Sequence, residues 1–131
     1  MEQTELSKYR TKGLLYDKCK HFSLSVIQLY NELISSNEFV ISKQLLRSST
    51  SIGANYSKAL GAESDADFLH KISISRKEIH ETLYWLELLR DSSLINEQTF
   101  SDLSNELADI FKMTNASIST IKQRIQNAKH N

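Results

Sequence analysis

The sequence predicts an all-α protein, an antiparallel up-down-up-down four-helix bundle, on three observations. The chain of 131 residues contains no proline and three glycines, too little turn punctuation for a domain of many short strands. Apolar residues recur at spacings of three and four along four long segments, the period of a helix with one buried face. The interruptions between these segments are short, so consecutive helices are expected to pack side by side in opposite directions.

The composition narrows the class of protein. A single cysteine excludes an internal disulfide and a four-cysteine zinc site, and favours a reducing compartment. The sequence lacks both a run of about 18 apolar residues and the apolar core of a signal peptide. Sixteen basic residues balance sixteen acidic ones, which argues against the uniformly basic surface of a dedicated nucleic-acid binder. We expect a soluble, cytoplasmic protein with no membrane contact.

The first helix is predicted from a regular apolar seam. Residues 1–12 are polar and mixed in charge, so we expect a loose N-terminal arm ahead of a single bundle domain at residues 13–131. A helix of about 20 residues follows. Cys19 lies in its seam and is expected to be a small buried hydrophobe rather than a reactive thiol. The seam consists of Leu15, Cys19, Phe22, Val26, Leu29 and Leu33.

The second helix is predicted to be narrow in its middle. Ser42 is the expected N-cap, with Asn37 as the alternative, and Gly61 is the expected C-cap. Gly53 stands in the interior among serines and an alanine. A glycine there costs about 1 kcal/mol relative to alanine, so we expect a neighbouring helix to approach closely at this point.

The third and fourth helices are predicted from their caps and seams. Ser64 is the expected N-cap of the third helix, with Asp67 in a capping-box position, and this helix should run to about Arg90. Asn96 is the expected cap of the fourth. The last seam consists of Phe100, Leu103, Leu107, Ile110, Thr114, Ile118, Ile121, Ile125 and Ala128.

The third helix is apolar on more than one side. Its core face is centred on Ile79, but three further apolar residues project to the opposite side at 100° per residue. A monomer would leave them in water. We therefore predict a homo-oligomer that assembles through the outer faces of the second and third helices, with an interface that includes Ile74, Trp85 and Leu88.

A row of polar residues on the second helix is expected to contact the third. Arg47, Ser51 and Asn55 lie four apart on one side. In an antiparallel pair Arg47 is about level with Glu78 and Glu81, which predicts charge-assisted hydrogen bonds across the helices or between subunits. We favour this structural role over ligand recognition.

Charge is unevenly distributed along the predicted bundle. The start of the first helix, the turn between the second and third, and the end of the fourth should share one end, where basic residues outnumber acidic ones. These charges could simply complement helix dipoles and keep the surface solvated. Alternatively, an oligomer would sum its basic ends and hold the phosphate backbone of RNA or DNA. The candidate contacts are Lys12, Lys18, Lys20, Lys58, Lys122, Arg124 and Lys129.

No catalytic, metal or cofactor site is predicted. Asp67 and His70 form one carboxylate–imidazole pair, whereas a di-iron bundle needs two pairs and two further carboxylates. His80-Glu81 begins like a zinc-protease helix, but Tyr84 stands where the second histidine is required. Glycine-rich phosphate loops and nucleophile elbows are absent from the sequence. We expect a protein that is not an enzyme.

Two motifs carry a resemblance to a known family. The string from Arg47 to Tyr56, RSSTSIGANY, followed by the segment Glu81 to Leu89, ETLYWLELL, resembles the four-helix-bundle family of 23S ribosomal RNA intervening-sequence proteins. That family includes proteins similar to the accessory variability determinant of diversity-generating retroelements. The resemblance implies a homopentameric barrel of four-helix protomers without known catalysis. In the retroelement branch it also implies binding of nucleic acid and of a reverse transcriptase through basic surfaces.

The chain departs from the family pattern in two features. Lys58 stands where many members carry an acidic residue, and the net charge is zero where the retroelement proteins are strongly basic. The sequence predicts a non-catalytic oligomeric accessory or scaffold protein, and the resemblance implies that its assembled basic end engages RNA or DNA. A structural adaptor that binds only protein is the alternative. Expected partners are further copies of the chain, RNA or DNA, and a reverse transcriptase or other protein.

Overall fold

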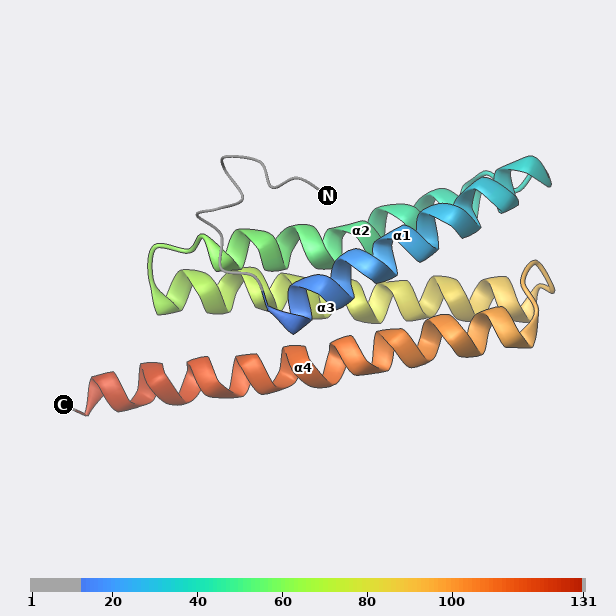
Figure 1. The fold of residues 1–131 in the computed structure, drawn as a ribbon. Coiled ribbons are helices and arrows are strands. Elements are labelled where there is room, and N and C mark those ends of the chain that lie inside the picture. The colour runs from blue at the N-terminus through green and yellow to red at the C-terminus, as the bar shows by residue number, and fades with distance from the viewer. Residues whose placement is uncertain (1–12, 131) are drawn as a thin grey trace.

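The computed structural model describes residues 13–130, which form four helices and no strand. The helices are α1 (Leu14–Ser35), α2 (Val40–Leu60), α3 (Asp65–Asp91) and α4 (Glu97–Lys129) (Figure 1). The all-α prediction is therefore confirmed for this part of the chain. The predicted N-terminal arm, residues 1–12, lies outside the described residues.

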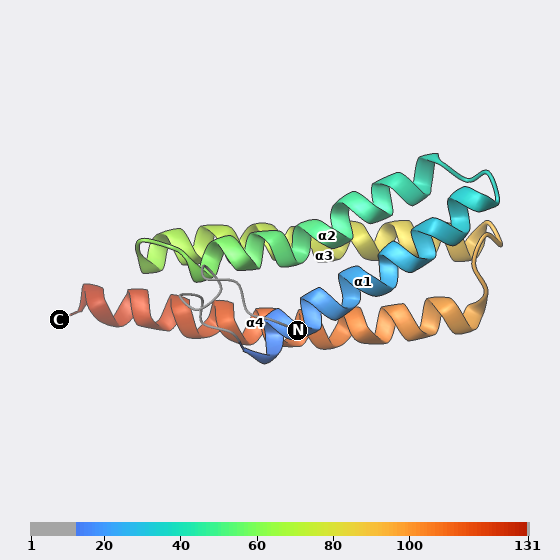
Figure 2. The same cartoon turned by 45° about the horizontal axis from the view of Figure 1, so that its top comes forward.

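The chain reverses direction at each of its three connections (Figures 1 and 2). Two buried hydrogen bonds fix the pairing of α2 with α3. The Ser75 hydroxyl donates to the Ile52 carbonyl at 2.6 Å, and the Thr82 hydroxyl donates to the Ser48 hydroxyl at 2.9 Å. Residue numbers thus rise along α3 as they fall along α2. Figure 1 also shows the C-terminal end of α4 reaching beyond the α2–α3 turn.

The core follows the predicted seams. Every residue of the α1 seam is buried, from Leu15 to Leu33. The α4 seam is buried from Leu103 to Ile121, but Ile125 is only partly buried and Ala128 is exposed. The last turns of α4 therefore extend past the interior of the bundle.

Gly53 marks a close approach of α2 to α1. A Cβ atom on Gly53 would lie 3.2 Å from the Cβ of Cys19, tighter than ordinary van der Waals contact. The expected close approach at Gly53 is confirmed, and its partner is α1. Burial raises the pKa of the Cys19 thiol to about 12, so Cys19 stays protonated and packs as a small buried residue, as predicted.

The caps of α3 and α4 are those that the sequence predicts. The Ser64 hydroxyl accepts from the Asp67 backbone N–H at 3.1 Å, and the Asp67 carboxylate accepts from the Glu63 N–H at 3.3 Å. The Asn96 side chain accepts from the Thr99 N–H at 2.7 Å. These bonds satisfy N–H groups that a helix start leaves without a partner.

The start of α2 differs from the prediction, because neither Ser42 nor Asn37 is its N-cap. The Glu38 carboxylate accepts from the backbone N–H groups of Val40, Ile41 and Ser42 at 3.1, 2.8 and 2.7 Å. Ser42 lies inside the helix, buried, and its hydroxyl donates to the Glu38 carbonyl. Asn37 adopts a positive φ of 66° in the preceding turn. A carboxylate with two acceptor oxygens satisfies more of these N–H groups than one hydroxyl does.

We predict that Glu38→Gln weakens this cap most at neutral pH. Partial desolvation acts to raise the pKa of Glu38, but the bonds from Ile41, Ser42 and Val40 hold it below its usual range. A lowered carboxyl pKa adds stability that is present above the unfolded-state pKa and lost as pH falls through the folded one. The variant should lose about 1 kcal/mol of unfolding free energy near pH 7, and the deficit should shrink on acidification.

Urea unfolding of both proteins from neutral pH to about pH 3 measures this difference. Glu97→Gln is the control, since Glu97 is a first-turn carboxylate of α4, where Asn96 makes the cap bond. A deficit for Glu38→Gln that stays constant over this pH range would contradict the proposed cap.

Candidate functional site

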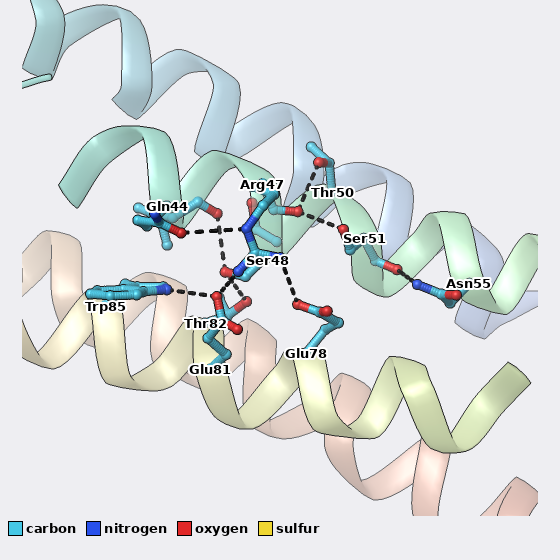
Figure 3. A network of polar contacts seen from close by, with 12 residues as sticks. Gln44, Arg47, Ser48, Thr50, Ser51, Asn55, Glu78, Glu81, Thr82 and Trp85 are labelled. Atoms are coloured by element: carbon cyan, nitrogen blue, oxygen red, sulfur yellow. Dashed lines mark hydrogen bonds and ion pairs between the residues drawn. The ribbon is translucent and has the colours of Figure 1, made fainter. Parts of the chain in front are cut away.

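The outer side of the α2–α3 pair carries a charged network (Figure 3). The Arg47 guanidinium donates to the Glu81 carboxylate, and its Nη1 lies 3.5 Å from the Glu78 Oε2. Its Nε donates to the Gln44 side-chain oxygen at 3.4 Å. The Trp85 indole N–H donates to the same Glu81 oxygen at 2.9 Å. The structure thus brings Arg47, Glu78 and Glu81 together within one chain.

Ser51 and Asn55 are placed differently from the prediction. The Ser51 hydroxyl donates to the Arg47 carbonyl at 2.7 Å, and the Asn55 amide donates to the Ser51 carbonyl at 2.8 Å. Both bonds run along α2 instead of across to α3. Short polar side chains in a helix readily reach the carbonyl one turn back, so the spacing that put them in one row also supplied a local partner.

One guanidinium serves two carboxylates in this network. The side chains of Glu78 and Glu81 are 19% and 36% exposed, against 50% for Arg47. The Glu78 Oε2 is buried and accepts no hydrogen bond within the described structure. Because a buried charge is costly unless hydrogen bonds satisfy it, Glu78 is the less well compensated of the two carboxylates.

Glu81→Gln and Glu78→Gln should therefore differ in their effects, although each replaces a carboxylate by a similar amide. Glu81→Gln weakens the bonds to both Arg47 and Trp85, and we expect a loss of about 1–2 kcal/mol of unfolding free energy. Glu78→Gln removes a poorly compensated buried charge and should cost less than about 0.5 kcal/mol. Chemical unfolding of the two variants at one protein concentration tests the order. A larger loss for Glu78→Gln would contradict the assignment.

The predicted interface residues Ile74, Trp85 and Leu88 are each partly buried within a single chain. Trp85 packs partly against the core, and Tyr84 meets its ring edge-to-face at a centroid distance of 5.2 Å. The sequence suggested that a lone chain would leave Trp85 in water. In the structure a single chain already buries part of the Trp85 side chain. The angular spacing of residues along α3 could not predict this partial burial, because it comes from α2, which covers one flank of the outer side of α3.

The strongly exposed apolar residues on this side are ones that the sequence reading did not select. Tyr84 is 56% exposed and Val40 is 75% exposed. The pairing of Ser48 with Thr82 places Val40 about level with Leu88, at the start of α2 and near the end of α3. Tyr84 directly precedes Trp85 in the sequence, and this position could have identified it as part of the same exposed apolar surface. We define the outer apolar strip as Val40, Tyr84, Trp85 and Leu88.

Two of the candidate basic residues are paired with acids. Lys18 Nζ lies 3.9 Å from the Asp109 carboxylate, and Arg124 Nη1 lies 3.4 Å from the Asp65 carboxylate. Lys12 lies outside the described residues. The predicted basic end is consequently less positive than a count of its lysines and arginines suggests.

The other candidates face solvent. Four of them are exposed and make no ion pair within residues 13–130. Arg124 pairs with Asp65 at the start of α3, so Lys122 is near the level of the α2–α3 turn and Lys129 is further along α4. Lys20 lies in the second turn of α1 and Lys58 in the last turn of α2. The four are Lys20, Lys58, Lys122 and Lys129.

Residues 13–130 contain no group of three or more histidine, cysteine or carboxylate side chains that could hold a metal ion. Asp67 is engaged in the start of α3 and pairs with Lys71 at 3.7 Å. None of the described helices combines the length and the apolar character that crossing a bilayer requires.

Comparison with known proteins assigns the chain to a family. The family model described as 23S rRNA-intervening sequence protein matches residues 12–116, a range that holds both sequence motifs and most of the four helices. The chain belongs to this family. Among curated proteins none matches the chain.

A solved relative has the same fold as this 23S rRNA-intervening sequence protein. It is a crystal structure, at 1.70 Å resolution, of a protein of unknown function from the S23 ribosomal protein family of Bacteroides thetaiotaomicron VPI-5482. The two sequences are 42% identical over 80% of this chain and 98% of the relative, with a TM-score of 0.79. The family and its fold are thereby established.

Proposed function

We propose that this chain is a non-catalytic scaffold protein that assembles with copies of itself through the outer side of α2 and α3. The observation that carries the proposal is the outer apolar strip, in which Val40 and Tyr84 are mostly exposed beside the half-buried Trp85 and Leu88. Contiguous exposed apolar surface is uncommon on monomeric proteins and marks interaction sites.

The surroundings of the strip support this reading. The Arg47–Glu81 pair borders it, and Trp85 joins the two through its bond to Glu81. Tyrosine, tryptophan and arginine are the residues enriched at the energetic centres of protein interfaces. Ile74, about three turns from Trp85 on the same helix, would extend the contact along α3.

A closed ring of up-down-up-down protomers is the assembly that the family resemblance implies, with five copies. A ring requires two different patches on each copy, because its interfaces are heterologous. Leu24 and Ile27 on α1 are 59% and 40% exposed. They supply apolar surface away from the α2–α3 side that could receive the outer apolar strip of a neighbour.

The assembly is tested with exposed positions whose substitution should spare the fold of one chain. Wild-type protein should have a solution mass several times that of one chain, which is 15.0 kDa. Val40→Asp combined with Tyr84→Asp should reduce the mass to that of one chain, because two carboxylates would lie in an apolar contact. Light scattering after size exclusion gives the mass. Leu14→Asp is the matched control, at a leucine that is 64% exposed at the start of α1.

A wild-type particle of 15.0 kDa at micromolar concentration would contradict self-assembly. The same conclusion would follow if the double variant kept the wild-type mass. A control variant that also fell apart would show that any added carboxylate disrupts the assembly and would remove the assignment to the strip.

Nucleic-acid binding is the second proposed role. Lys58, Lys122 and Lys129 are exposed without ion pairs in the described structure, and a ring would bring several copies of them together. The zero net charge of the chain gives this role less support than the assembly has. A reverse transcriptase, implied by the likeness to the retroelement accessory proteins, is proposed only as a partner within that branch.

If this second role is correct, the wild-type assembly should be retained on an immobilised RNA duplex at low salt. Retention should fall steeply as salt is raised, because binding to phosphates releases counterions. Chromatography on the duplex in a salt gradient measures it. An intact assembly that passes through at low salt would favour the protein-only adaptor instead.

A further inference from the structure

The side of the molecule formed by α3 and α4 combines two stretches that contain no acidic residue. One is residues 68–77 of α3 and the other is residues 110–129 of α4. The structure packs them together, since Arg76 Nη1 donates to the Asn115 side-chain oxygen at 3.1 Å and Ile72 shares a buried cluster with Ile118. We define the α3–α4 basic lane by its cations, which are Arg76, Lys77, Lys112 and Lys122.

The acids that flank the lane are held on other sides of the bundle. Glu78 faces the Arg47 of α2, and Asp109 pairs with Lys18 of α1. Asp67 is bound at the start of α3 and pairs with a lysine of its own helix. Lys77, Lys112 and Lys122 are exposed and lack ion pairs within residues 13–130. Glu81, one turn from Lys77, is bonded to Arg47 and Trp85. The three lysines are thus left without a carboxylate partner in the described structure.

Uncharged polar groups accompany the cations along α4. Asn115, Ser119, Lys122 and Gln126 follow Lys112 at spacings of three and four, so they line one side of the helix. Side chains of these types contact phosphate and sugar groups in protein–nucleic acid complexes. From Lys112 to Lys122 the helix rises about 15 Å, which matches several base pairs of a duplex at about 3.4 Å each.

The lane favours a duplex over a single strand. Single-stranded nucleic acid is usually held by bases stacked on exposed aromatic rings. Beside the α4 cations lies Phe111, which is half-buried and already meets the His80 ring edge-to-face at 5.3 Å. The exposed Tyr84 ring on α3 belongs to the outer apolar strip, which the proposed assembly would cover. Contacts to the phosphate backbone are what this surface offers.

We propose that the α3–α4 basic lane binds the phosphate backbone of a nucleic-acid duplex, without sequence preference. The inference rests on the proposed nucleic-acid role and places the contact along the side of α3 and α4 instead of at the basic end. On α3, Lys77 lies on the same side as Tyr84, two turns further along, whereas Lys112 and Lys122 lie on α4. The α4 part of the lane is therefore outside the outer apolar strip. Neutralising about four phosphates gives an affinity that falls about a hundredfold for a fourfold rise in salt.

The test compares two charge reversals of equal size. Lys77→Glu with Lys112→Glu alters the lane, and Lys20→Glu with Lys58→Glu alters exposed lysines outside it. Each pair changes the chain charge by the same amount at positions that make no ion pair in the described structure. Fluorescence anisotropy with 20-base-pair RNA and DNA duplexes of unrelated sequence measures affinity at low salt. Light scattering and circular dichroism check the assembly and fold of both variants.

The lane variant should bind at least tenfold more weakly than wild type, and the control variant within about threefold of it, with every duplex sequence tested. Similar losses for the RNA and DNA duplexes would assign binding to the shared backbone, and a loss confined to one would assign it to that duplex form.

Three results would overturn the inference. Wild-type protein that binds no duplex would remove the nucleic-acid role together with the lane. Wild-type binding that is weakened by the control variant but not by the lane variant would keep the role and move it to the basic end. Competition by polyglutamate as strong as by unlabelled duplex would show a surface for acidic proteins instead.

Discussion

The arrangement of this bundle depends on how closely α2 approaches its two neighbours. On one side Gly53 leaves room for the Cys19 side chain of α1. On the other side Ser48, Ser75 and Thr82 are buried and hydrogen-bonded between α2 and α3. Large side chains at these positions would force the helices apart and leave buried hydroxyls without partners, which costs more than their hydrogen bonds gain. The narrow middle of α2 therefore sets the geometry on which the outer surface of the α2–α3 pair is built.

That geometry determines what the α2–α3 surface presents. Because small residues fill the contact between the two helices, the bulky polar and aromatic groups lie at its outer edge, where Arg47 bridges Glu78 and Glu81 and Trp85 closes the network. The network leaves one carboxylate oxygen of Glu78 buried without a hydrogen bond. A buried carboxylate oxygen without a hydrogen bond destabilises a single chain. A hydrogen-bond donor from a neighbouring copy at this surface would satisfy it.

The sequence predicted features that depend on local periodicity, and missed those that depend on contacts between helices. The helix number, the seams, the caps at Ser64 and Asn96 and the close approach at Gly53 follow from spacing within one segment. The cap by Glu38 was not predicted because Glu38 precedes the first residue of α2, outside the segment whose apolar spacing identifies the helix. That Arg47 and Glu81 lie opposite each other could be predicted by counting residues outward from the α2–α3 turn. The partial burial of Trp85 could not be predicted, because it depends on how far α2 covers α3.

The two sides of α3 also differ in a way that separates assembly from ligand binding by their response to salt. The side of α3 toward α2 has Glu78 and Glu81 beside Arg47, and the side toward α4 has Arg76, which bonds to Asn115 in the part of α4 that contains no acid. Apolar contacts persist as ionic strength rises, whereas attraction to a phosphate backbone is lost through counterion release. The proposed assembly and the proposed duplex contact therefore rest on different physical forces and should respond differently to ionic strength.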